Sequence, residues 1–202
     1  MRPSTARYSH TAIALHWLLA IAIVATFLVG WNMVDMKMSL LRLKLYNWHK
    51  WAGVCILALS AGRLLWRLFH EPPPDMPMPT WQRAAAHWTH RLLYVLFFAV
   101  PLAGWAYSAT AGYPVVLFGV LPLPFPLDVD RELSEAIKPW HGYLAYSLAA
   151  LVGLHVAGAL KHQFIDRHRL IQRMWPSFIK ARPVIPAPRT SRTRSTPSKA
   201  RP

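Results

Sequence analysis

Cysteine and acidic side chains are scarce in this chain of 202 residues. The single cysteine, Cys55, lies inside an apolar stretch, so no intramolecular disulfide can form and we expect the thiol to serve packing only. Asp and Glu number 8 against 23 Lys and Arg, which leaves a formal net charge of +15. A fold stapled by disulfides is therefore excluded, and the large positive charge needs an explanation.

The positive charge is not spread evenly along the chain. Hydrophobic residues make up 54% of the sequence, which is too apolar for an ordinary soluble domain. Arginine and lysine crowd the C-terminal end and avoid the apolar stretches. This distribution favours a membrane protein with a basic cytoplasmic flank, and it argues against a nucleic-acid partner.

Four long apolar segments predict an all-α fold, an integral membrane four-helix bundle. Each is about as long as the hydrocarbon core is thick, and they cover residues 12–34, 48–69, 89–110 and 140–163. The first continues beyond the length of a cleavable signal peptide, so we expect it to be retained. The four spans form one predicted domain over residues 1–176. Residues 177–202, rich in Pro, Ser, Thr and Arg, are expected to be a disordered, basic cytoplasmic tail.

Basic residues also predict the orientation. They flank the fourth span and the Pro-rich 70–88 loop, which places both termini in the cytoplasm. The 111–139 loop carries acidic residues and is expected to face outward. The 35–47 loop, with Lys37, Arg42 and Lys44, is a partial exception on the outer side.

Four histidines lie in or at the ends of these spans, where an ionisable side chain is costly and suggests function. His141 and His155 are 14 residues apart in one predicted helix, hence on nearly the same face and ~21 Å apart along the axis. By depth, His49 pairs with His141 at the outer side and His16 with His155 at the inner side. Two imidazoles facing each other across a bundle suit a haem iron and leave it no open position. The pattern therefore predicts two haems in the bundle core and a role in electron transfer.

Further candidates surround the inner pair. Arg63 lies 14 residues after His49, at inner-haem depth, where its guanidinium either pairs with a haem propionate or snorkels to the surface. His87 and His90 share a helix face at the inner edge and could contact propionates or a quinone headgroup, or simply be solvated. His162, seven residues after His155, is a further quinone candidate.

Two glycines repeat the 14-residue spacing. Gly30 follows His16 and Gly104 follows His90 at that interval, so both are expected at outer-haem depth. A missing side chain there makes room for a flat macrocycle or for tight packing of a neighbouring helix.

The sequence resembles the bacterial cytochrome b561 family of di-haem membrane cytochromes over about residues 8–176. The matching elements are YSHTAIALHW, NWHKWAG, GRLLWRL, AHWTHRLLY, PLAGW, KPWHGYLAY and GLHVAGALKHQF. The resemblance implies four helices in a bacterial inner membrane and two b-type haems with bis-histidine ligation. The family's ligand positions match His16, His49, His141 and His155.

Within that family the chain most resembles a superoxide oxidase. The resemblance implies an oxidoreductase in which periplasmic superoxide gives an electron at the outer haem and ubiquinone accepts it in the membrane. Four basic residues near the outer mouth would steer a small anion by raising its local concentration, or else only snorkel at helix ends. They are Lys138, Lys50, Arg42 and Lys44.

Three alternatives remain at this point. The protein could be an electron carrier that anchors a soluble oxidoreductase partner and links it to quinone. A transporter using histidines for metal ions or protons would lack a haem Soret band and would be expected to show repeats or broken helices. A structural scaffold would not need four depth-matched histidines.

Overall fold

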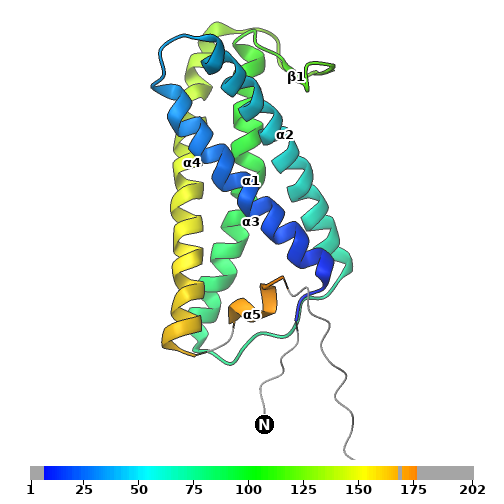
Figure 1. Cartoon of the computed structure of the whole chain (residues 1–202), viewed down its shortest axis with the longest axis vertical. Coiled ribbons are helices and arrows are strands. Elements are labelled where there is room, and N and C mark those ends of the chain that lie inside the picture. The colour runs from blue at the N-terminus through cyan, green and yellow to red at the C-terminus, as the bar shows by residue number, and fades with distance from the viewer. Residues whose placement is uncertain (1–6, 168–169, 177–202) are drawn as a thin grey trace, which may run out of the picture.

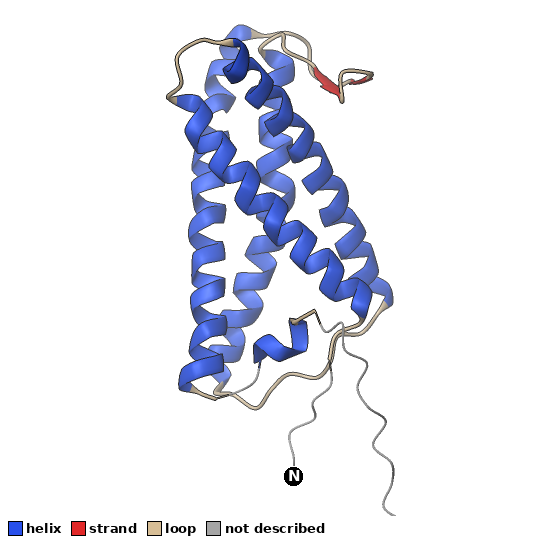
Figure 2. Cartoon of the chain, viewed as in Figure 1, coloured by secondary structure: helices blue, strands red, loops and turns tan. Residues whose placement is uncertain are grey.

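The computed structural model describes residues 7–167 and 170–176 as an elongated helical bundle (Figures 1 and 2). The long helices are α1 (His10–Val34), α2 (Leu40–Phe69), α3 (Thr80–Thr110) and α4 (Arg131–Leu160). Strands β1 (Val115–Leu117) and β2 (Leu121–Leu123) form an antiparallel hairpin between α3 and α4. Within these described ranges four helices are long and apolar enough to cross a membrane, which confirms the predicted all-α membrane bundle.

The helices extend beyond the predicted spans. The Ser39 hydroxyl accepts a hydrogen bond from the Arg42 amide (3.2 Å), and the Asp130 carboxylate accepts one from the Leu133 amide (3.0 Å). These N-caps begin α2 and α4 well before their apolar stretches, and α3 begins at residue 80. The loops expected at 35–47, 70–88 and 111–139 are therefore partly helical. Hydropathy detects the membrane-buried part of a helix, whereas polar caps set its true ends.

The buried core is small and lies in the middle of the bundle. Leu19, Ile23, Ile56, Leu93 and Leu148 form one cluster contributed by all four long helices. Many other large apolar side chains on these helices are exposed. Ile21, for example, is 65% exposed. An apolar outer surface of this kind suits lipid, since no water would contact it inside a bilayer.

The chain after α4 turns back beneath the bundle, at the end where α1 begins (Figure 1). A π-helical turn, η1 (Lys161–Ile165), continues α4, and the short helix α5 (Leu170–Met174) follows. The Trp17 indole donates to the Met174 carbonyl (2.7 Å), and the Arg173 guanidinium donates to the Pro74 carbonyl (2.9 Å). These bonds tie α5 to α1 and to the loop before α3. The predicted tail over 177–202 lies outside the described residues.

Candidate functional site

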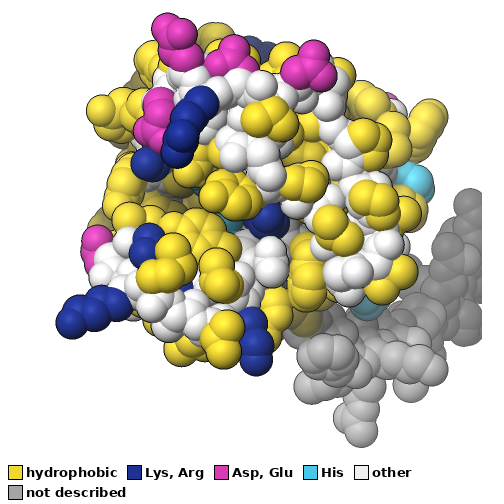
Figure 3. All heavy atoms as spheres, turned by 90° about the horizontal axis from the view of Figure 1, so that it is seen from above, with side chains coloured by type: hydrophobic (Ala, Val, Ile, Leu, Met, Phe, Trp, Pro, Cys, Tyr) yellow, Lys and Arg dark blue, Asp and Glu magenta, His cyan; other side chains and the backbone are white. Residues whose placement is uncertain are grey.

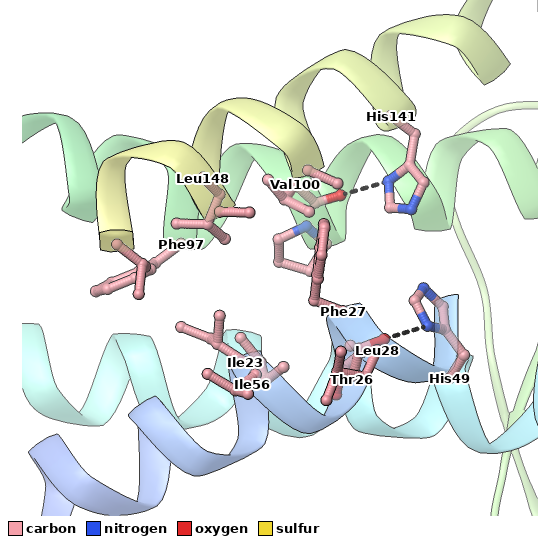
Figure 4. A pocket seen from close by; sticks show the side chains of 16 residues that line it. Ile23, Thr26, Phe27, Leu28, His49, Ile56, Phe97, Val100, His141 and Leu148 are labelled. Atoms are coloured by element: carbon pink, nitrogen blue, oxygen red, sulfur yellow. Dashed lines mark hydrogen bonds between the residues drawn. The ribbon is translucent and has the colours of Figure 1, made fainter. Parts of the chain in front are cut away.

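His49 and His141 face one another at the end of the bundle that also carries the hairpin (Figure 4). His49 comes from α2 and His141 from α4, their ring centroids are 6.1 Å apart, and their planes are at 90°. Beside them lies a cavity of about 180 Å³. Its lining is almost entirely apolar and includes Ile23, Phe27, Ile56, Phe97 and Leu148. A lining of this apolar character is typical of a site for an apolar cofactor.

Hydrogen bonds fix the tautomer of both imidazoles. Nδ1 of His49 donates to the Thr26 carbonyl (3.1 Å), and Nδ1 of His141 donates to the Val100 carbonyl (3.0 Å). Because a carbonyl only accepts, each Nδ1 carries the ring proton and each Nε2 keeps a free lone pair. In Figure 4 the other ring nitrogens of the two residues point toward one another. This is how metal-ligating histidines are usually held.

Gly30 and Gly104 make these hydrogen bonds possible. Thr26 precedes Gly30 by one helical turn, and Val100 precedes Gly104 by one turn. A Cβ on Gly30 would lie 2.8 Å from Cε1 of His49, and a Cβ on Gly104 would lie 2.8 Å from Cε1 of His141. The space left by each glycine is thus taken by an imidazole ring, where the sequence suggested a macrocycle or a neighbouring helix.

Three imidazoles meet at the opposite end of the bundle. The ring centroids of His16 on α1 and His155 on α4 are 6.3 Å apart. His90 on α3 lies closer to His155, at 5.2 Å. The structure therefore brings together both histidine pairs expected from depth, and it adds His90 to the second.

Arg63 lies at this same end and has a nitrogen in need of a partner. Its Nε donates to the Tyr94 hydroxyl (3.2 Å), whereas its Nη1 is buried and has no hydrogen-bond partner among the described residues. Buried polar atoms in folded proteins are almost always satisfied. An unsatisfied guanidinium nitrogen near the half-buried His16 and His155 indicates room for an anionic group such as a carboxylate.

The two remaining histidine candidates have partners of their own. His87 is exposed, and its Nε2 lies 3.3 Å from the Asp75 carboxylate. His162, in η1, lies with Nδ1 2.7 Å from the Asp166 carboxylate, which also accepts from Lys161 (2.7 Å). The Lys161 hydrogen bond, followed by that of His162, holds the pKa of Asp166 below its usual range.

The basic residues predicted to steer an anion lie at the His49 and His141 end, which Figure 3 views from above. The Lys50 ammonium donates to the Tyr113 carbonyl (3.4 Å), and Lys138 lies 3.6 Å from the Glu135 carboxylate. Arg42 donates to the Val34 carbonyl (3.2 Å), and Lys44 is exposed on α2. In Figure 3 the acidic side chains gather toward one edge, while a basic side chain lies in the central hollow.

The residues present fit a haem. Metal–nitrogen bonds of about 2 Å on both sides of an iron place two imidazole centroids roughly 6 Å apart. The separations of 6.1 Å and 6.3 Å match this value. An iron requires nitrogen lone pairs such as those on Nε2, and a macrocycle requires apolar walls. A propionate requires a cationic partner such as the buried guanidinium nitrogen.

Comparison with known proteins agrees with the fit of these residues to a haem. A family model described as prokaryotic cytochrome b561 matches residues 7–177. "Cytochrome b561 homolog 2" of Escherichia coli (strain K12) is 33% identical over 172 residues, covering 83% of this chain and 90% of that protein. "Probable superoxide oxidase CybB" of Yersinia pestis is 28% identical over 175 residues, covering 84% of this chain and 96% of that protein.

Proposed function

Because the chain belongs to the prokaryotic cytochrome b561 family, we propose that it holds two b-type haems and passes single electrons between an outer donor and ubiquinone. The family binds haem b and acts in electron transfer, and the four apolar helices make this chain a membrane protein. The observation that carries the proposal is the His49 and His141 pair, with both Nε2 atoms free and both Nδ1 atoms tied to carbonyls.

Each haem would be held by one histidine pair. His49 and His141 would hold the outer haem, and His16 and His155 would hold the inner haem. A haem held in this way would supply one-electron oxidation and reduction. The protein orients the imidazoles through the Thr26 and Val100 carbonyls, and its apolar walls exclude water. Arg63 offers a charged partner to an inner propionate.

Superoxide is the donor that the chain's charges favour. One relative is named a probable superoxide oxidase, and the end with His49 carries Lys50, Arg42 and Lys44. Two superoxide anions would give up one electron each and leave as O₂. One ubiquinone would take both electrons with two protons and leave as ubiquinol. His90 and His162 lie at the opposite end, where a quinone headgroup would find hydrogen-bonding partners.

The decisive experiment measures haem content and reduction on the purified protein. We expect two b-type haems per chain by pyridine haemochrome, and reduction of the haem band by superoxide that superoxide dismutase abolishes. Added ubiquinone should then reoxidise the band. Haem without reduction by superoxide, together with a co-purifying soluble oxidoreductase, would favour the anchor-subunit function. A folded helical protein without haem would overturn the proposal.

Replacing Lys50 by glutamine is expected to slow reduction by superoxide about threefold at low salt, because one steering charge is lost beside His49. The difference should shrink as salt is added, since the Debye length falls from about 10 Å at 0.1 M to about 3 Å at 1 M. Arg83→Gln is the matched control, because it removes one exposed positive charge at the start of α3, at the opposite end of the bundle from His49. Stopped-flow traces at several salt concentrations measure both. Equal rates for the two variants, at equal haem content, would contradict steering by Lys50.

A further inference from the structure

The β1–β2 hairpin projects sideways from the bundle, beyond α2, at the end that carries His49 and His141 (Figures 1 and 2). Residues 111–127 around it contain no charged side chain. At its turn and second strand, Phe118 is 64% exposed, Val120 is 83% exposed and Leu121 is 55% exposed. We name these three side chains the hairpin tip. A cluster of this kind facing water would be unfavourable, so its surroundings need to be identified.

The hairpin is packed against the bundle. The Trp51 indole of α2 donates to the Val116 carbonyl (2.7 Å), and its ring lies 5.6 Å from that of Phe118. Val115 is only 2% exposed. Phe118 has a positive φ of 53°, a conformation that bulky residues rarely adopt unless the surroundings impose it. The exposed tip is therefore held in one place.

Tryptophans at this end of the bundle show the depth at which the hairpin lies. Trp31 of α1, Trp48 of α2 and Trp140 of α4 are 57%, 53% and 62% exposed. Tryptophans around the ends of spanning helices mark the membrane–water interface. Trp51, which holds the hairpin, lies within one helical turn of Trp48. The hairpin thus projects sideways at the level where lipid headgroups surround the helices.

We propose that the hairpin is an interfacial anchor whose tip is inserted among the lipid headgroups and upper acyl chains of the surrounding leaflet. Lipid is the favoured occupant because the tip packs through Phe118 against Trp51 of the spanning helix α2 and carries no charge. The nearest charged groups along the chain, Asp128 and Asp130, come only after residue 127, where the chain returns to water before α4. This anchoring goes beyond the proposed electron transfer and does not depend on it.

Site-directed spin labelling of the full haem-loaded protein tests the anchor. A label on Val120→Cys, in a Cys55→Ala background, is measured in phosphatidylcholine–phosphatidylglycerol vesicles for collisions with O₂, which partitions into lipid, and with a water-soluble nickel chelate. The native Cys55, exposed on α2, is the lipid reference. Val129→Cys in the same background is the water reference, because Val129 is 73% exposed between two aspartates. We expect the ratio of O₂ to nickel accessibility at position 120 to exceed that at position 129 severalfold.

Two results would overturn the anchor. Nickel accessibility at position 120 equal to that at position 129 would place the tip in water. Low accessibility to both reagents, with a broadened spectrum, would place it under another protein or a second copy of this chain. Circular dichroism and haem content, unchanged from those of the wild-type protein, would show that each labelled variant is folded.

Discussion

Replacing His49 by alanine is expected to reduce the haem content from two per chain to one. The alanine removes one of two nitrogens that approach the cavity beside His141, and the remaining imidazole holds an iron from one side only. Mutation of a residue that only orients a metal ligand typically lowers metal affinity about 10–100-fold, and loss of the ligand itself lowers the affinity further. The measurement is pyridine haemochrome on protein purified in parallel with the wild type, with circular dichroism to verify the helices.

The other histidines give this prediction its controls. His141→Ala should remove the same haem as His49→Ala, and His16→Ala should remove the other haem. A redox titration identifies which haem is lost when the two haems have different reduction potentials. His90→Ala should leave both haems bound. The His90 ring lies closer to His155 than His16 does, but its 5.2 Å centroid separation leaves too little room for an iron between the rings. Loss of a haem in His90→Ala, with both haems retained in His16→Ala, would show that His90 and not His16 is the partner of His155.

The histidine pairs could be expected from sequence because membrane depth is a one-dimensional property. A span has a known rise per residue, so His141 and His155 each find a partner at matching depth without any knowledge of packing. The structure then brings His49 within 6.1 Å of His141 and His16 within 6.3 Å of His155. Whether these pairs hold haem stays a prediction that the variants above test.

The groups that orient the imidazoles could not be predicted in this way. Every residue has a carbonyl, so nothing in the sequence distinguishes those of Thr26 and Val100. The one sequence feature that points to these carbonyls is the pair of glycines, Gly30 and Gly104. Which side chain fills the space beside each glycine depends on how the helices pack. The sequence pattern does not predict the hairpin, because prolines and a lack of charge are equally typical of an irregular loop. The position of α5 depends on the Trp17 bond to a carbonyl, which has no sequence pattern.

Replacing Gly30 by alanine is expected to weaken the outer haem site without touching a ligand. The new methyl carbon would lie 2.8 Å from Cε1 of His49, closer than side-chain contacts allow, and at a tight 3.3 Å from Nδ1 of the same ring. The imidazole must move away from α1, and its hydrogen bond to the Thr26 carbonyl lengthens or breaks. Loss of such an orienting bond lowers metal affinity by about 10–100-fold. We expect fewer than two haems per chain after purification, with the deficit at the haem that His49→Ala also loses.

The helix itself provides the matched control for this substitution. Alanine favours a helix over glycine by about 1 kcal/mol, so Gly30→Ala should not unfold α1. Gly153→Ala makes the same chemical change in α4, where a Cβ would meet nothing within 4 Å, and it should keep both haems. Haem titration of the two variants after partial haem removal compares their affinities directly. Equal affinity in Gly30→Ala and Gly153→Ala would mean that the imidazole is not held by the carbonyl, and that the iron alone orients His49.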